Sequence, residues 1–153
     1  MNWIWMHSRG DEGAEVWKRQ FAQYRSAGIE GVLTLVHNGT QALSAAVFAT
    51  PELARTYVRQ DWPSWDLDAA FPMIYHPYYA KPAMWIETAT REGVDEIGGK
   101  FPLYSGLFVG AIEAGDLPRA VERAADAGAA GVCLFSHGAM TDAHWRALTQ
   151  IKM

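Results

Sequence analysis

RQDWPSWDLDAAFPMIYHPYY, residues 59–79, places two Trp, three Tyr and one His around the apolar run AAFPMI at 69–74. The run is short and apolar, which predicts a buried strand over 69–75. Pro72 lacks a backbone N–H, so it marks an irregularity in that strand. Flat rings beside hydroxyl and imidazole groups suit a pocket for a polar, ring-shaped ligand such as a sugar. Trp62 and Trp65 precede the strand and are expected to pack beneath the sheet instead.

Short apolar runs alternate with helical patterns along the rest of the chain. Thr50 and Thr141 are helix-capping signals, and Gly93 is a stop signal. The order of strand then helix predicts parallel strands, either in a sheet covered on both sides or in a barrel. The expected strands are 3–7, 32–36, 45–48, 69–75, 103–109 and 132–135, and the expected helices are 13–27, a short one from 51, 82–92, 116–127 and one from 141.

One connection has no helix. Only residues 37–44 separate the strand that ends at Val36 from the strand that begins at Ala45. A parallel crossover needs about a dozen residues or more, so these two strands cannot be parallel neighbours joined in the usual way. Asn38-Gly39 is the signal of a type I′ turn, which favours an antiparallel hairpin. The alternative is that a longer ancestral segment is absent from this junction.

The composition is that of one folded domain, residues 1–153, with 50% hydrophobic and 20% charged residues. A net charge of -4 without a Lys/Arg cluster argues against a nucleic-acid partner. No apolar run approaches the ~20 residues of a membrane span. No signal peptide precedes Trp3, so the chain is expected to be soluble, and cytoplasmic unless a leader has been removed.

Three further side chains are expected in the core. Cys133 lies in the apolar run 131–135, and Tyr57 and Trp145 lie at core spacing on their helices. These residues are therefore predicted to be structural.

Five stretches of the chain carry a resemblance to a known family. They are NWIWMH at 2–7, SAAVFATPELARTYVRQDW at 44–62, WDLDAAFPMIYHPYY at 65–79, FPLYSGLFVG at 101–110 and GAAGVCLFSHGAMTDAHW at 128–145. Together they resemble a bacterial family of glycoside hydrolase-like (β/α)8 barrels. The resemblance implies barrel strands one, two, five, six, seven and eight, with the region of strands three and four missing at 37–44. A full barrel has ~250 residues. The expected fold is therefore an α/β, shortened or incomplete TIM-type barrel of about six strands and five helices.

Polar and aromatic side chains follow the ends of these expected strands. In an α/β barrel such residues meet at one face, where the site is built. Tyr rings would stack on sugars while His and Asn bond to hydroxyls. Imidazoles also suit zinc, but no carboxylate joins them and no HxH or HxxxH pair is present, so no metal or cofactor is predicted. The predicted substrate-binding residues are His7, Arg9, His37, Asn38, Tyr75, His76, Tyr78, Tyr79 and His137.

Catalytic carboxylates are harder to place. Glycoside hydrolysis ordinarily needs two carboxyls ~5–10 Å apart. Asp11 and Glu12 precede the first expected helix, where acidic residues commonly favour the helix dipole. Glu113, in a glycine-containing loop, is the one named catalytic candidate, although a solvated role suits it better. The family's Asp-rich strand-four motif has no counterpart here.

Three functional readings follow. The first is a carbohydrate-active, glycoside hydrolase-like protein that binds oligosaccharide or polysaccharide and is impaired in catalysis by the missing region. The second is a non-catalytic, degenerate barrel that binds a glycan or a partner. The third is a metal-dependent hydrolase that uses the strand-end histidines. Six strands do not close an eight-stranded barrel, so open sheet edges are also expected to favour self-association.

Overall fold

The computed structural model describes residues 3–9, 31–37 and 42–151, and it places side chains for residues 42–151. The expected helix at 13–27 and the predicted turn at Asn38-Gly39 lie outside the described residues.

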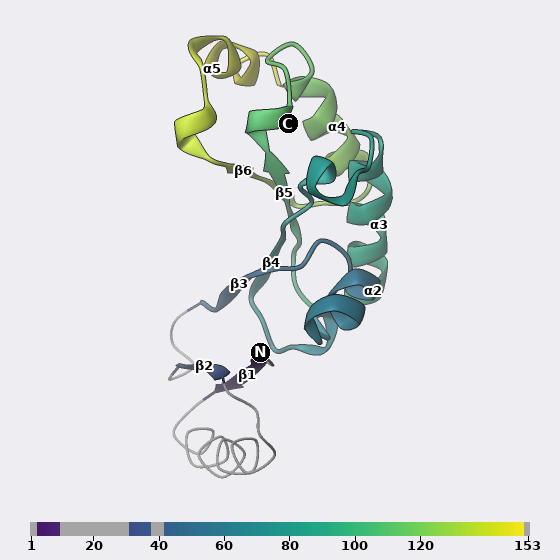
Figure 1. The fold of residues 1–153 in the computed structure, drawn as a ribbon, viewed down its shortest axis with the longest axis vertical. Coiled ribbons are helices and arrows are strands. Elements are labelled where there is room, and N and C mark those ends of the chain that lie inside the picture. Colours follow the sequence, from purple (N-terminus) through teal and green to yellow (C-terminus); the bar gives the residue numbers. More distant parts are fainter. Residues whose placement is uncertain (1–2, 10–30, 38–41, 152–153) are drawn as a thin grey trace.

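All described strand pairs are parallel, which confirms that part of the prediction (Figure 1). Two bridges, Ala70 to Leu103 and Met73 to Gly106, join β4 to β5. They give the spatial order β3-β4-β5-β6. The three pairs are β1 (Trp3–Arg9) with β2 (Gly31–His37), β3 (Ser44–Val47) with β4 (Ala69–Pro72), and β5 (Tyr104–Phe108) with β6 (Gly131–Phe135).

The expected barrel is wrong. The described strands form three two-stranded sheets. Among the described strands, β1 pairs only with β2, and β2 pairs only with β1. The expected hairpin across 37–44 is also wrong, because β3 takes β4 as its partner, in parallel, and not β2. Four parallel strands linked by two bridges make an open, twisted layer, which has too few strands to close on itself.

The helices α2, α3 and α4 lie on one side of β3 to β6, and α5 lies apart from them, beyond β6 (Figure 1). The helices α3 and α4 follow β4 and β5 in the chain and cover the same face of these strands. The described α-helices are α2 (Pro51–Leu53), α3 (Trp85–Ile97), α4 (Leu117–Asp126) and α5 (Asp142–Leu148). A π-helix, η1 (Ala54–Val58), continues α2, and the short 3-10 turns are η2 (Trp62–Ser64), η3 (His76–Tyr79), η4 (Val109–Ala111) and η5 (His137–Ala139).

Both predicted N-caps are confirmed. The Thr50 hydroxyl accepts a hydrogen bond from the Leu53 backbone N–H, and Pro51 occupies the first turn. The Thr141 side chain accepts from the His144 N–H, while the His144 ring bonds back to the Thr141 N–H. This arrangement is a capping box with histidine in place of the usual Glu or Gln.

The predicted stop at Gly93 is wrong. The helix α3 runs through Gly93 and ends at Gly98, which has a φ of 60°. A Cβ at Gly93 would lie 2.7 Å from Leu103 Cδ1 and 3.0 Å from Trp62 Cη2. Gly93 therefore lets α3 approach the sheet closely and does not terminate the helix.

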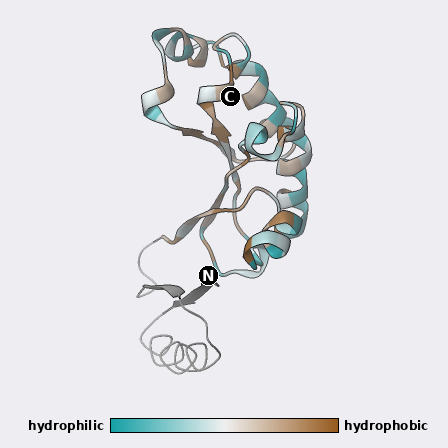
Figure 2. Cartoon of the chain, in the orientation of Figure 1, coloured by the Kyte–Doolittle hydropathy of each residue, from teal (hydrophilic) through white to brown (hydrophobic). Residues whose placement is uncertain are grey.

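Two buried clusters fill the space between helices and strands. Along each strand, the residues that belong to these clusters alternate with residues that do not. This alternation is expected when one face of a sheet is covered. Figure 2 shows hydrophobic colour along the strands and mixed colour along the helices. One cluster contains Ile74, Leu107, Ile86, Leu117 and Ala124, and the other contains Val47, Trp62, Ala70, Ile97 and Leu103.

The core predictions have mixed outcomes. Trp62 is fully buried and Trp65 packs against its cluster, as predicted. Tyr57, Trp145 and Cys133 were expected inside and are exposed. Cys133 is exposed because α3 and α4 cover only one face of the strands. A closed barrel would have enclosed the other face as well.

We expect Gly93→Ala to lower the free energy of unfolding by up to about 2 kcal/mol. The added methyl overpacks the contact with Trp62 and Leu103, which costs about 1–3 kcal/mol, and the better helix propensity of Ala offsets about 1 kcal/mol. Urea denaturation measures the difference. Gly115→Ala is the control, because a Cβ at Gly115 meets no atom within 4 Å. Equal stability of the two variants would contradict the close approach.

Candidate functional site

Four aromatic rings meet at the carboxyl ends of three neighbouring strands. We call Tyr75, Tyr78, Phe108 and Phe135 the ring cluster. The Tyr75 and Phe135 rings are stacked, with centroids 5.3 Å apart and planes 17° apart. The Tyr78 and Phe108 rings are 5.1 Å apart, and Tyr75 contacts both of them. Since ligands of open α/β sheets bind at the carboxyl ends of strands, this is where a site is expected.

The local sequence explains how Tyr75 reaches the ring cluster. After Pro72 the chain leaves the regular ladder. The N–H groups of Ile74, Tyr75 and His76 then bond to carbonyls only two residues back, at 2.9, 2.8 and 3.0 Å. A 3-10 turn follows and ends at Ala80, which has a φ of 52°. This tight path carries Tyr75 and Tyr78 to the strand ends.

The ring cluster is partly open to solvent. Tyr78 is 69% exposed and Phe135 is 50% exposed, while Tyr75 and Phe108 are half-buried. Burial raises the pKa of Tyr75, and the nearby Cys133, Tyr78 and Tyr79 raise it further. The Tyr75 hydroxyl therefore remains protonated at neutral pH and is able to donate a hydrogen bond.

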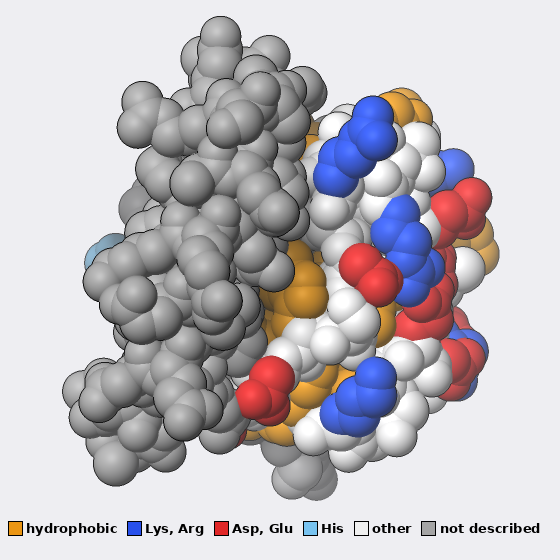
Figure 3. Space-filling model, turned by 90° about the horizontal axis from the view of Figure 1, so that it is seen from below, with side chains coloured by type: hydrophobic (Ala, Val, Ile, Leu, Met, Phe, Trp, Pro, Cys, Tyr) orange, Lys and Arg blue, Asp and Glu red, His pale blue; other side chains and the backbone are white. Residues whose placement is uncertain are grey.

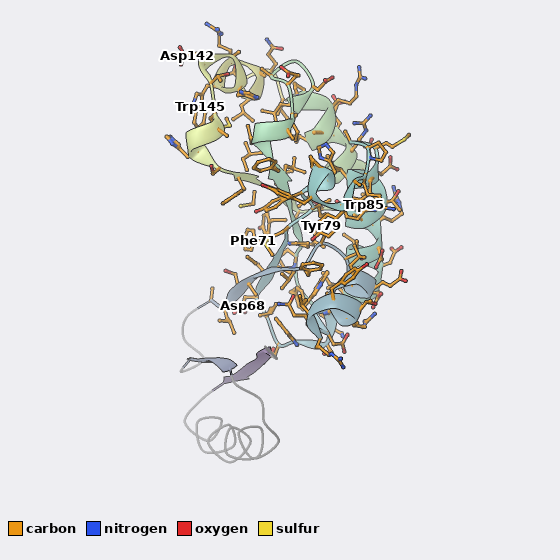
Figure 4. The ribbon with its side chains drawn as sticks, in the orientation of Figure 1. Asp68, Phe71, Tyr79, Trp85, Asp142 and Trp145 are labelled. Atoms are coloured by element: carbon orange, nitrogen blue, oxygen red, sulfur yellow. The ribbon has the colours of Figure 1, made fainter. Side chains whose placement is uncertain are left out.

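A second ring row lies apart from the ring cluster and consists of Phe48, Tyr57, Tyr79 and Trp85. Centroid distances are 6.3 Å for Phe48–Tyr57, 5.6 Å for Phe48–Tyr79 and 5.1 Å for Tyr79–Trp85. Figure 4 shows Tyr79 and Trp85 near α3. Burial raises the pKa of Tyr79, although a backbone hydrogen bond involving Ala49 opposes the shift. The structure thus separates Tyr79 from Tyr75 and Tyr78, with which it was grouped in the sequence.

His76 is a buried side chain. It is 7% exposed, and its Nδ1 atom has no hydrogen-bond partner among the described residues. Burial lowers the pKa of His76, and the positive charge of Arg123 on α4 lowers it further. A buried, neutral imidazole is poorly placed to contact a ligand at the ring cluster.

Among the predicted site residues with described side chains, His137 and Glu113 do not join the ring cluster. His137 is exposed, and its ring lies 5.8 Å from that of Trp145. The side chain of Glu113 is exposed in the loop before α4. Arg9 and His37 are register partners at the ends of β1 and β2.

His7 lies opposite Leu35 in the same strand pair. The structure describes β1 and β2 as strands without their side chains, and Asn38 lies outside the described residues. Of the predicted site residues whose side chains the structure describes, only Tyr75 and Tyr78 therefore belong to the ring cluster.

Two residues of the ring cluster were missed by sequence reasoning. Phe108 and Phe135 are register partners at the last positions of β5 and β6. In the sequence, polar side chains at strand ends indicate a site, whereas apolar side chains at strand ends are typical of the core. The signal that could have found them is the alignment of Tyr75, Phe108 and Phe135 at equivalent strand ends.

The fifth histidine, His144, has a structural role. Its Nε2 atom bonds to the Ile112 carbonyl at 2.8 Å, so this nitrogen donates, and Nδ1 accepts from the Thr141 N–H at 3.2 Å. The first bond ties α5 to the end of η4, and the second belongs to the capping box of α5. His144 is thereby satisfied without a ligand.

The described residues contain no group of three or more His, Cys, Asp or Glu that could hold a metal ion. Within the same residues, no helix combines the length and apolar character needed to cross a membrane.

No family model matches the chain, and no curated protein matches it.

We expect stability to fall at acidic pH through His76. Above about pH 6.5 the ring is neutral in both the folded and the unfolded chain. Below that value the unfolded chain takes up a proton that the folded chain resists, so stability declines until the pH reaches the lower, folded pKa. Thermal melts of the wild type and His76→Gln from about pH 5 to 8 measure the effect. Parallel curves for the two proteins would contradict this role of His76.

Proposed function

We propose that this chain binds carbohydrate through the ring cluster. The observation that carries the proposal is the meeting of four rings at three neighbouring strand ends, with Tyr78 and Phe135 half or more exposed. Flat, amphipathic rings offer an apolar surface for the C–H face of a pyranose together with a polar edge. The Tyr75 and Tyr78 hydroxyls supply hydrogen bonds for sugar hydroxyls. The resemblance of the sequence to glycoside hydrolase-like proteins points to the same class of ligand.

The proposed activity is binding without hydrolysis. Cleavage of a glycosidic bond ordinarily needs an acid and a second carboxyl held on either side of the bond. Glu113 is exposed, and no described carboxylate belongs to the ring cluster. General acids of this chemistry are enclosed in apolar surroundings that keep them protonated, and an exposed carboxylate lacks such surroundings.

Tyr78→Ala is expected to weaken glycan binding by about tenfold or more, because an exposed ring that stacks on a sugar contributes a large share of the affinity. Tyr57→Ala is the matched control: Tyr57 has the same residue type and the same 69% exposure, but it belongs to the second ring row. Isothermal titration calorimetry with a panel of oligosaccharides, and affinity electrophoresis with polysaccharides, measure the binding. Equal losses in the two variants, or no binding to any glycan in either assay, would refute the proposal.

The same samples test hydrolysis. Reducing-end release is expected to stay at the background level in the wild type. Turnover that Glu113→Gln abolishes would show that the chain is a hydrolase and that the non-catalytic part of the proposal is wrong.

A further inference from the structure

We propose that His137 and Trp145 form a second sugar contact beside the ring cluster, so that the chain binds an oligosaccharide across two or more sugar units. We call these two side chains the outer pair. The sequence predicted His137 as a binding residue and Trp145 as a core residue, whereas the structure brings their rings to 5.8 Å. The inference rests on the proposed function and extends the same site along the strand ends toward α5.

Trp145 is exposed on a helix that packs firmly through its other side. On α5, His144 and Ala147 are buried, and Leu148 packs against the cluster that contains Ile74. These positions follow helical spacing, and Trp145 lies outside the stripe that they form, with 47% of its surface exposed. An indole has an apolar face and a polar N–H edge, so an exposed Trp on a fixed helix suits a ligand with apolar and polar parts.

The outer pair lies next to the ring cluster along β6. Only Ser136 separates Phe135 of the ring cluster from His137. The Cα atoms of Phe135 and His137 therefore lie at most about 7 Å apart. Figure 4 shows Trp145 beside α5, beyond the carboxyl end of β6.

A second connection fixes α5 from the end of β5. The His144 Nε2 atom donates to the Ile112 carbonyl at 2.8 Å. Ile112 follows η4, and η4 lies against the ring cluster, because a Cβ at Gly110 would be 3.0 Å from Phe108 Cζ. Both strands that contribute a Phe to the ring cluster thus hold α5, so the outer pair is pre-organised beside that cluster.

Exposed hydrophobic side chains gather at this end of the molecule. Five large ones are exposed among the described residues, and three of these, Tyr78, Phe135 and Trp145, belong to the ring cluster or the outer pair. Each repeating unit of an oligosaccharide presents a C–H face and hydroxyl groups. A ring face beside hydrogen-bonding groups at two neighbouring places therefore matches two successive units of such a chain.

The opposite end of the molecule has a different surface. Figure 3, which views the molecule from below, shows Lys, Arg, Asp and Glu side chains interspersed over the described surface there. In the described helices and turns, Arg55 pairs with Asp61 and Glu96. A glycan would meet charges of both signs at that end, whereas it would meet ring faces at the α5 end.

The dependence of affinity on the length of the glycan tests the inference. The probes for isothermal titration calorimetry are gluco-, xylo-, manno-, galacto- and chito-oligosaccharides, each from the monosaccharide to the hexasaccharide. We expect wild-type affinity to rise with length. Trp145→Ala is expected to weaken binding of the longer members by about three- to tenfold and to leave the shortest member that binds unchanged. Tyr78→Ala is expected to weaken binding of every member.

Three further variants sharpen the comparison. Trp145→Phe keeps a flat ring and is expected to retain most of the gain with length. His137→Ala is expected to reduce that gain, as Trp145→Ala does. Tyr57→Ala removes an exposed ring outside both contacts and is expected to change nothing. Circular dichroism verifies that each variant is folded.

The outcomes separate this inference from the proposed function. An equal gain with length in the wild type and Trp145→Ala, or no gain in the wild type, would overturn the inference while binding through Tyr78 remained. Equal weakening of every member by Trp145→Ala would also overturn it, because Trp145 would then act on the first contact or on the fold. Absence of binding to all of the probes would refute the proposed function and this inference with it.

Discussion

The covering of a single face of the parallel strands is the constraint on which the rest of this structure depends. A strand, a helix and the next parallel strand are joined by a right-handed crossover in nearly all proteins. The chain from β4 through α3, β5 and α4 to β6 contains two such units in succession, and both helices lie on the same face. Apolar side chains on that face become the core, while those on the other face remain partly or fully exposed.

Close contacts hold the covered face together. Gly93 allows α3 to rest on Trp62 and Leu103. A buried hydrogen bond of 2.7 Å joins the Thr90 and Ser105 hydroxyls between α3 and β5. Such a bond is worth about 1 kcal/mol, and it also satisfies two polar groups that would be costly to leave unpaired. The helix is thereby fixed in both distance and register.

The same constraint places the candidate site. Tyr75, Phe108 and Phe135 end neighbouring strands, so they meet once the strands are aligned in parallel. The turn that carries Tyr78 ends at Ala80, which has a side chain and still adopts a positive φ. Backbone strain of this kind is found at binding sites, where the surrounding structure holds it in place.

Local signals in the sequence predicted much of the secondary structure. The apolar runs located β3 to β6, and their order predicted parallel pairing. Thr50 and Thr141 marked helix starts correctly, because a cap depends on a residue and its neighbours within one turn. The same local view failed at Gly93, where a packing contact with residues ten or more positions away decided that the helix continues.

Sequence reasoning found half of the ring cluster. Tyr75 and Tyr78 were identified by their density in one stretch, whereas Phe108 and Phe135 looked like ordinary core residues. His76 was placed at the site beside Tyr75, although the structure buries it, with the charge of Arg123 nearby. Neighbours along an extended chain point in opposite directions, so adjacent residues in the sequence were separated in space.

The residue pattern alone was enough to establish short parallel strands, capped helices and a concentration of rings near residue 75. Only the tertiary structure decided which face of each strand is covered, that the strands remain an open layer, and that rings from three strands form one cluster. Periodicity shows that a strand has two faces, but it carries no information on which face a distant helix will cover. That choice depends on contacts between residues far apart in the chain.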